Sequence, residues 1–243
     1  MSSVIIKSDG AAILYDPNVL GKIESSFFDP AFWRARDALT GSARGRGAAW
    51  FVRHEGRELV LRHYRRGGLI APLLGDRYLW TGLARTRAMR EWHMLDELAR
   101  CGFPVPRPVA ARVRRHGIYY RADLLTERIP DAESLAQTLA RTPFAAPQWR
   151  AIGQCLRRFH AANVWHADLN AHNILLAHAQ VYVIDFDRGR LDAPSAHLAR
   201  NIDRLKRSLD KLAGQQPGFH FTADDWAELL AGYADSAVGT AHI

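Results

Sequence analysis

The spacing of apolar residues divides the chain into a β-rich first half and a mainly helical second half. In the first half, short apolar runs bounded by turn residues predict strands, and two segments with helical periodicity predict helices. Gly102 is well placed to end the second helix, and the prolines at 104, 106 and 108 exclude further helix because proline lacks a backbone N–H. The expected strands are Ala48–Arg53, Glu58–Tyr64, 109–115 and 118–126, and the expected helices are 30–39 and about 81–100.

In the second half, helical periodicity extends over four segments and is interrupted by one hairpin. Ile174–Leu176 and Val181–Ile184 are two short apolar runs joined by four residues, a spacing typical of paired antiparallel strands. The expected helices are 132–141, 147–162, 195–213 and 222–234.

This change of pattern predicts an α+β chain in two lobes. We expect a β-rich N-terminal lobe over residues 1–127 and a helical C-terminal lobe over residues 128–243, with a connector near Thr126–Asp131. A chain of 243 residues is long enough for one compact domain or two lobes. A ligand would lie between such lobes, as in many cleft enzymes.

Polar residues with the spacing of a phosphoryl-transfer site flank the predicted hairpin. Residues 166–173 read His-Ala-Asp-Leu-Asn-Ala-His-Asn, and Asp185-Phe186-Asp187 follow the second strand. In a kinase site, an Asp accepts the proton of the attacking hydroxyl, while an Asn five residues later and an Asp beyond a short hairpin bind Mg²⁺. Asp168, Asn173 and Asp185 match these positions. An accidental polar loop could produce the first motif alone, but the hairpin and the second acid favour the catalytic interpretation.

The first half contains candidates for the nucleotide-binding part of such a site. Gly41, Gly45 and Gly47 could form a loop whose backbone N–H groups approach phosphates, although a plain flexible hairpin loop has the same composition. Arg62 ends the run Val-Leu-Arg, where a kinase usually carries Lys to hold the α- and β-phosphates. An exposed strand arginine is the alternative interpretation of Arg62.

Three further residues complete the candidate site. Glu91 is the preferred partner for the strand cation, with Glu97 as a second choice and a solvated helix carboxylate as the alternative for either. Glu127 lies in the connector, whose backbone would contact adenine. We expect His166 to orient the loop through hydrogen bonds and to transfer no proton itself.

Charge and composition narrow the classes of partner. The net charge is +8, and only four of the 33 basic residues are lysines. Guanidinium groups bind phosphates and carboxylates bidentately, so nucleic acid, an anionic membrane or a polyanionic small substrate would each fit such a surface. No nucleic-acid-binding motif is present in the sequence, so we expect no nucleic acid partner. The two cysteines form no C-x-x-C pair, which argues against a disulfide framework or a zinc site.

Targeting signals are also lacking from the sequence as written. It contains no run of eighteen apolar residues, and its first residues lack the basic start and apolar core of a signal peptide. We therefore expect a protein of the cytoplasmic compartment.

Three motifs together resemble a known family. Residues 61–68, Trp165–Leu175 and Ile184–Gly189 are similar to the 3-deoxy-D-manno-octulosonic acid (Kdo) kinases, a small bacterial branch of the lipopolysaccharide kinases with a protein-kinase-like fold. The resemblance extends from about residue 40 to about residue 212. Arg in place of Lys at position 62, and Asp in place of Gly at position 187, agree with this family pattern.

The resemblance implies a function. It implies ATP- and Mg²⁺-dependent phosphorylation of the 4-hydroxyl of a Kdo residue on a lipid A precursor, at the cytoplasmic face of the bacterial inner membrane. Asp168 would be the base, and Asn173 and Asp185 would bind Mg²⁺. No Ala-Pro-Glu motif follows Asp185, which disfavours a peptide substrate.

An anionic glycolipid would favour a basic rim around the site. The candidates for substrate contacts are Arg65, Arg66, Arg188, Arg204 and Arg207. The last two lie on the expected helix 195–213, beside an apolar stripe, where a solvated basic face is an equally good interpretation. A kinase for another acceptor and a non-catalytic kinase-shaped module that binds anionic glycolipid remain alternatives.

Overall fold

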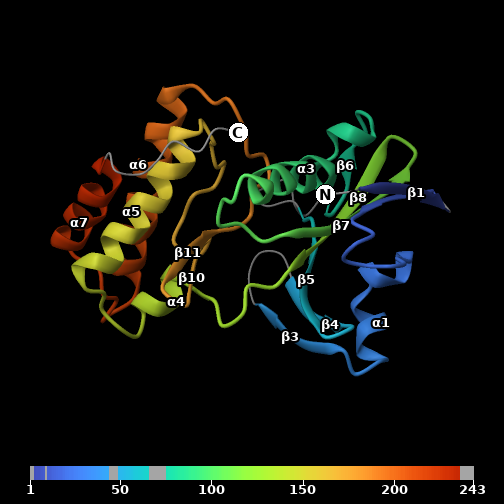
Figure 1. Cartoon of the computed structure of the whole chain (residues 1–243), viewed down its shortest axis with the longest axis horizontal. Helices are drawn as coiled ribbons and strands as arrows, with labels where there is room; N and C mark the ends of the chain where they lie inside the picture. The colour runs from blue at the N-terminus through green and yellow to red at the C-terminus, as the bar shows by residue number, and fades with distance from the viewer. Residues whose placement is uncertain (1–2, 9, 44–48, 66–74, 236–243) are drawn as a thin grey trace. The chain divides into compact units, whose positions relative to one another are not determined.

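The computed structural model describes residues 3–8, 10–43, 49–65 and 75–235 (Figure 1). The chain forms two compact units, one from Met1–Asp96 and Pro106–Arg128 and the other from Glu97–Val105 and Ile129–Ile243. An antiparallel sheet dominates the first unit, and helices dominate the second. The predicted α+β class is therefore confirmed.

The first unit is built on one antiparallel sheet with the strand order β1-β2-β7-β8-β5-β4-β3, and β6 pairs with β8 beside this path. Alternation along the strands directs one set of side chains to each face of the sheet. The strands are β1 (Val4–Ser8), β2 (Ala11–Tyr15), β3 (Leu39–Ala43), β4 (Ala49–His54), β5 (Arg57–His63), β6 (Tyr78–Leu79), β7 (Pro108–His116) and β8 (Tyr119–Glu127).

One face of this sheet carries the main apolar core of the first unit. The short helices η1 (Ser25–Phe28) and α1 (Pro30–Arg34) place Phe27, Phe28 and Trp33 against strand residues such as Leu61. The Asp29 carboxylate accepts a hydrogen bond from the backbone N–H of Ala31 and so caps α1.

The side chain next to Leu61 on β5 belongs to the opposite face. There Arg62 contacts α3 (Arg87–Arg100), which follows the short 3₁₀ helix η2 (Leu83–Arg85). Figure 1 shows α1 and α3 on opposite sides of the sheet.

In the second unit, α5 and α7 pack unusually closely. A Cβ atom on Gly153 of α5 would lie 2.0 Å from the Leu229 carbonyl oxygen, and one on Gly232 of α7 would lie 2.2 Å from that of Arg150. Only glycine permits this approach at either position. The helices are α4 (Leu135–Leu139), α5 (Ala146–Ala161), α6 (Ser195–Gln215) and α7 (Ala223–Ala234).

A small sheet completes the second unit. Strands β9 (Glu133–Ser134), β10 (Ile174–Ala177) and β11 (Gln180–Val183) pair in the order β11-β10-β9. His178 and Ala179 form the turn between β10 and β11, both with positive φ, as the tightest hairpin turns require. The predicted hairpin before Asp185 is thus confirmed.

Several predicted boundaries were wrong. The helix expected over 30–39 ends at Arg34, because Asp37 adopts a φ of 53° and Leu39 already begins β3. The helix expected from residue 81 begins only at Arg87, since Gly82 has a φ of 107°. The helix expected over 132–141 is restricted to α4, and β9 occupies the residues before it. Strands β1, β2, β3 and β6 were not predicted.

Candidate active site

His166 fixes the shape of the loop formed by residues 166–173, called here the Asp168 loop. Its Nδ1 accepts a hydrogen bond from the backbone N–H of Asp168 at 3.1 Å, and its Nε2–H donates to the carbonyl of Ile184 at 2.9 Å. This pattern requires the neutral ring. Burial lowers the pKa of His166 and so favours the same state. The imidazole therefore ties Asp168 to the residue that precedes Asp185.

Two asparagines hold the backbone of Asp168. The side-chain nitrogens of Asn170 and Asn173 each donate to the Asp168 carbonyl at 2.9 Å. The Asn173 carbonyl in turn accepts from the backbone N–H of Ile184 at 3.0 Å. Within the described chain, the side-chain oxygen of Asn173 accepts no hydrogen bond, which leaves it able to bind a cation.

The carboxylate of Asp168 is held by one arginine. Arg204 of α6 donates from Nε to Oδ1 at 2.8 Å and from a terminal nitrogen to the same oxygen. Both side chains are about half exposed, at 46% for Asp168 and 49% for Arg204. Oδ2 of Asp168 accepts no hydrogen bond from any residue that the structure describes. One carboxylate oxygen is thus anchored and the other is open.

Side chains on one face of helix α6 hydrogen-bond to several residues of the Asp168 loop. The side chain of Asn201 accepts from the backbone N–H of His166 at 3.0 Å and donates to its carbonyl at 2.6 Å. Ser208 accepts from the backbone N–H of Ala171 at 3.2 Å. Asn201, Arg204 and Ser208 recur at helical spacing, so they share a face. Asn201 and Ser208 were not predicted. Asn201 stands three residues after Leu198, at a position of the apolar stripe of this helix, and a polar residue at such a position was a usable signal.

Asn201 also contacts a buried histidine. Nε2 of His160 on α5 lies 3.4 Å from Oδ1 of Asn201, and its Nδ1 lies 2.7 Å from the Tyr233 hydroxyl of α7. Burial lowers the pKa of His160 to about 4. The ring is therefore neutral at physiological pH and connects α7 to the residue that holds His166.

This burial predicts a pH-dependent stability. In the unfolded chain His160 becomes protonated below about pH 6.5, whereas in the folded protein it becomes protonated only near pH 4. The free energy of unfolding therefore falls as the pH falls through this interval. We expect this residue to lower the unfolding free energy by about 2 kcal/mol between pH 7 and pH 5. Urea unfolding at both values should show a correspondingly smaller drop for His160→Gln, since every other group titrates in both proteins. An equal drop in the two proteins would contradict the buried neutral ring.

Asp185 and Phe186 follow the hairpin. Asp185 adopts a φ of 65°, a conformation that costs energy for a residue with a side chain and often marks a functional site. Phe186 is 1% exposed and packs edge-on against His166, with ring centroids 4.8 Å apart. The hairpin and this packing fix the backbone on both sides of Asp185.

In the first unit, Arg62 and Glu91 form a buried ion pair. A terminal nitrogen of Arg62 contacts Oε2 of Glu91, and the Tyr64 hydroxyl donates to the same oxygen at 2.5 Å. Glu91 is only 2% exposed and Arg62 is 23% exposed. The guanidinium also lies 5.0 Å from the centre of the Tyr64 ring. The structure therefore joins Arg62 to Glu91, and it adds Tyr64, which the sequence analysis did not single out.

The other residues predicted to contact the nucleotide lie on strands β3 and β8 or outside the described residues. Gly41 lies within β3, beside an irregularity in its pairing with β4, while Gly45 and Gly47 fall outside the described residues. Glu127 ends β8; its backbone N–H donates to the Arg107 carbonyl and its carboxylate pairs with Arg57 at 3.2 Å.

The predicted substrate arginines have different surroundings. Arg65 is exposed two residues after the end of β5, and Arg188 is exposed in the turn after Phe186 with a φ of 65°. Arg207 is exposed on α6, whereas Arg204 lies on Asp168. Arg66 lies outside the described residues.

The donor atoms near the hairpin suit Mg²⁺. This cation prefers oxygen ligands and often takes only one or two from a protein, completing its shell with water and substrate phosphates. The Asn173 side-chain oxygen and the Asp185 carboxylate are oxygen donors of this kind. Within the described residues, no group of three His, Cys, Asp or Glu side chains is placed to hold a metal by itself.

Comparisons with known proteins agree with these features. The model of the lipopolysaccharide kinase (Kdo/WaaP) family matches residues 30–233. A 3-deoxy-D-manno-octulosonic acid kinase of Photobacterium profundum is 44% identical over 93% of this chain and 95% of its own. One of Xylella fastidiosa is 47% identical over 84% of this chain and 82% of its own.

A solved structure shows the same fold. WaaP, determined in complex with acyl carrier protein, superposes with a TM-score of 0.52 at 22% identity, covering 83% of this chain and 81% of that one. The resemblance stated from the three sequence motifs is thus confirmed. On the family match and these identities, the chain belongs to the lipopolysaccharide kinase (Kdo/WaaP) family.

Proposed function

We propose that this chain transfers the γ-phosphoryl group of ATP to the 4-hydroxyl of a Kdo residue on a lipid A precursor. The names of its relatives support the acceptor sugar, and membership of a kinase family supports ATP as the donor. The observation that carries the proposal is the state of Asp168, with one carboxylate oxygen anchored by Arg204 and the other open. A base for a sugar hydroxyl needs this combination of fixed position and free acceptor.

Asp168 acts as the base and as the orienting group. Its open Oδ2 accepts a hydrogen bond from the acceptor hydroxyl and takes the proton as the oxygen attacks phosphorus. The neutral His166 and the two asparagines keep the Asp168 backbone in place while the charge shifts. Arg204 orients the carboxylate and lies near the negative charge that develops during transfer.

Asn173 and Asp185 are the residues that would hold Mg²⁺. The ion, when bound, neutralises the negative charge of the nucleotide phosphates. Arg62, kept in place by Glu91 and Tyr64, would bind the α- and β-phosphates. Arginine has a planar donor fork where most kinases have an ammonium group, so it can contact two phosphate oxygens at once.

The acceptor suggests where the protein works. A lipid A precursor is anchored in a bilayer, so we propose a peripheral position at the cytoplasmic face of the inner membrane. The described part of the chain contains no helix that is both long and apolar enough to cross a membrane.

The proposal is tested by the mass of the product. Purified protein should add one phosphate to a Kdo-bearing lipid A precursor in the presence of ATP and Mg²⁺, with the phosphate located at the 4-hydroxyl by NMR. Asp185→Asn should abolish transfer and also remove Mg²⁺-dependent binding of a fluorescent ATP analogue, because the charged metal ligand is lost. Asp192→Asn, an exposed aspartate after the same segment, is the matched control. Transfer by Asp185→Asn at the wild-type rate would refute the metal assignment, and transfer only to other sugars would refute the acceptor.

A further inference from the structure

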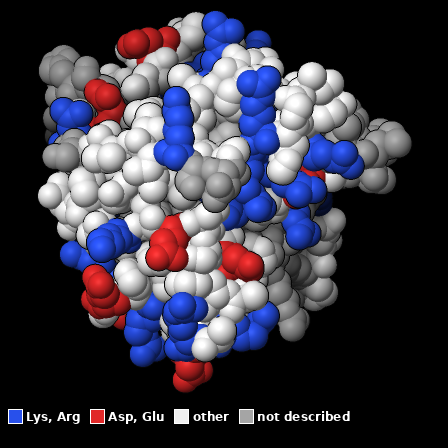
Figure 2. Space-filling model, turned by 90° about the vertical axis from the view of Figure 1, so that its right-hand side faces the viewer, with Lys and Arg blue, Asp and Glu red and all other residues white. Residues whose placement is uncertain are grey.

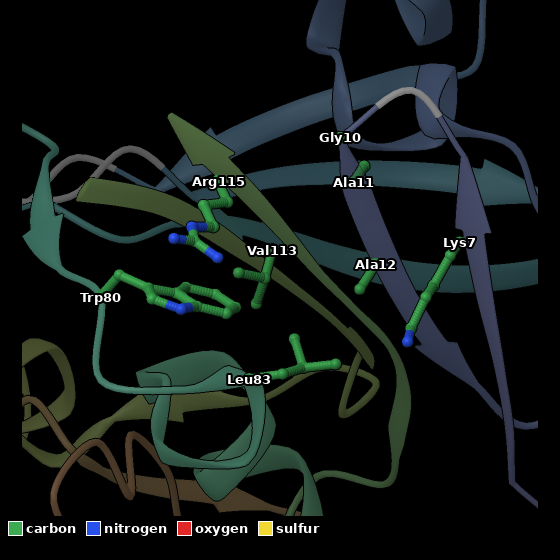
Figure 3. Close-up of a pocket in the computed structure, with 8 residues that line it drawn as sticks. All are labelled: Lys7, Gly10, Ala11, Ala12, Trp80, Leu83, Val113 and Arg115. Atoms are coloured by element: carbon green, nitrogen blue, oxygen red, sulfur yellow. The ribbon is translucent and has the colours of Figure 1, made fainter. Parts of the chain in front are cut away.

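The first unit contains a cavity that the proposed reaction does not use. It has a volume of about 410 Å³, and Figure 3 shows its walls. Two of its lining residues are basic, and its walls are otherwise formed mainly by apolar and aromatic side chains. The side chains that form these walls include Lys7, Ala12, Trp80, Leu83, Val113 and Arg115.

The sheet register explains why this space exists. Lys7 of β1 is opposite Ala12 of β2, and Ala12 is opposite Val113 of β7, so the three side chains form one row on the same face of the sheet. The methyl group of Ala12 is too small to fill the middle of this row. Trp80 and Leu83, which follow β6, form the facing wall (Figure 3).

The charges of the two basic residues that line the cavity are not balanced by an acid within the part of the chain that the structure describes. Among the residues that the structure describes, neither Lys7 nor Arg115 forms an ion pair with a carboxylate. Arg115 donates instead to the Gly117 carbonyl at 2.9 Å and lies 4.9 Å from the centre of a Trp80 ring. Positive charge beside apolar walls matches a ligand that is anionic at one end and apolar at the other.

Exposed apolar side chains lie next to the cavity wall. Leu79, which precedes Trp80, is 59% exposed, and Ile118 in the turn between β7 and β8 is 66% exposed. The backbone N–H of Trp80 donates to the Ile118 carbonyl at 2.8 Å, so the two segments are neighbours. A single exposed apolar residue needs no explanation, but two beside a Trp-lined basic cavity resemble the interfacial residues of membrane-binding proteins.

We propose that the cavity, together with Leu79 and Ile118, is a docking surface for an anionic phospholipid bilayer. A lipid phosphate pairs with Lys7 and Arg115, while Leu79 and Ile118 enter the interface and the indole of Trp80 lies at headgroup depth. Charge complementarity supports this occupant: the chain carries a net charge of +8, and Figure 2 shows that Lys and Arg are spread more widely than Asp and Glu over one face. The inference rests on the proposed function in one respect, since a lipid-anchored acceptor requires an enzyme that works at a bilayer.

Vesicle sedimentation tests the surface with the full chain. We expect the protein to bind phosphatidylcholine vesicles that contain phosphatidylglycerol, and to bind pure phosphatidylcholine weakly. Lys7→Glu/Arg115→Glu should lower the partition onto the anionic vesicles at least about 10-fold. Lys22→Glu/Arg53→Glu makes the same change of charge at exposed positions outside the cavity and should leave most of the binding intact.

Two further variants serve as controls. They test whether the double substitution acts through misfolding and whether the effect is purely electrostatic. Lys7→Glu alone alters an exposed side chain on an edge strand and should still weaken binding several-fold. Leu79→Ser/Ile118→Ser keeps the charge and should also lower binding to the anionic vesicles about 10-fold. Wild-type binding by the cavity variants, or an equal loss in the control pair, would overturn the docking surface.

The assay separates this inference from the proposed function. A detergent-dispersed acceptor needs no bilayer, so Lys7→Glu/Arg115→Glu should phosphorylate it at the wild-type rate while losing activity on the same acceptor in vesicles. Absence of transfer by the wild type would refute the function without affecting the vesicle measurement. Equal rates of the variant and the wild type on vesicles would refute the surface alone.

Discussion

Asp168→Asn is expected to lower the kcat of phosphoryl transfer by about 10²–10⁴ with almost no loss of stability. Asparagine keeps the size of the side chain but cannot accept the proton of the acceptor hydroxyl. The ion pair with Arg204 joins two side chains that are each about half exposed, and such pairs contribute about 0–1 kcal/mol. Steady-state assays should therefore show a large fall in kcat. Guanidinium unfolding of the same preparations should show almost no change in the free energy of unfolding.

Asp203 provides the control for this substitution. It is an exposed carboxylate beside Arg204 on α6, so Asp203→Asn changes the local charge equally without touching Asp168. We expect its kcat to remain within about twofold of the wild type. If Asp168→Asn also stayed within that range, the base would have to be sought elsewhere.

The second large effect is expected at the buried pair in the first unit. Glu91→Ala removes the carboxylate that pairs with the Arg62 guanidinium, itself 23% exposed, and leaves a cavity beside it. Breaking a buried pair in this way costs about 3–5 kcal/mol of stability. The KM for ATP should rise as well, because Arg62, which we propose binds the phosphates of ATP, loses its fixed position.

A double substitution separates these two consequences. In Arg62→Met/Glu91→Leu, apolar side chains replace the whole pair, a change that is often neutral for stability. We expect denaturant unfolding to return close to the wild type while ATP binding stays weak. Tyr64→Phe, which removes one hydrogen bond to Glu91, should cost only about 1 kcal/mol. Normal ATP affinity in the double variant would show that Arg62 has a structural role alone.

The parts of the site that are local in sequence could be predicted. The interval between Asp168 and Asn173, and the hairpin that leads to Asp185, depend on a few neighbouring residues and on strand periodicity. For the same reason, α5, α6 and α7 were recognised close to their observed bounds.

What the sequence did not reveal depends on contacts between distant segments. Asn201 and Ser208 face the Asp168 loop only because α6 packs beside it, and Tyr64 reaches Glu91 only in the folded first unit. Strand β1 was missed because it is an edge strand with exposed Val4 and Ile5, so its alternation between buried and exposed positions is weak. Tertiary contacts override local preference at all of these places.

The close contact between Gly153 and Gly232 gives the last helix an influence over distant chemistry. This contact lets α7 pack closely against α5 and so keeps the Tyr233 hydroxyl beside His160. His160 in turn contacts Asn201, which holds the backbone of His166. A bulky residue at either glycine would push the helices apart and let water reach this relay of hydrogen bonds. A genetic screen for inactive kinases should therefore return substitutions at Gly153 and Gly232 that touch neither nucleotide nor sugar.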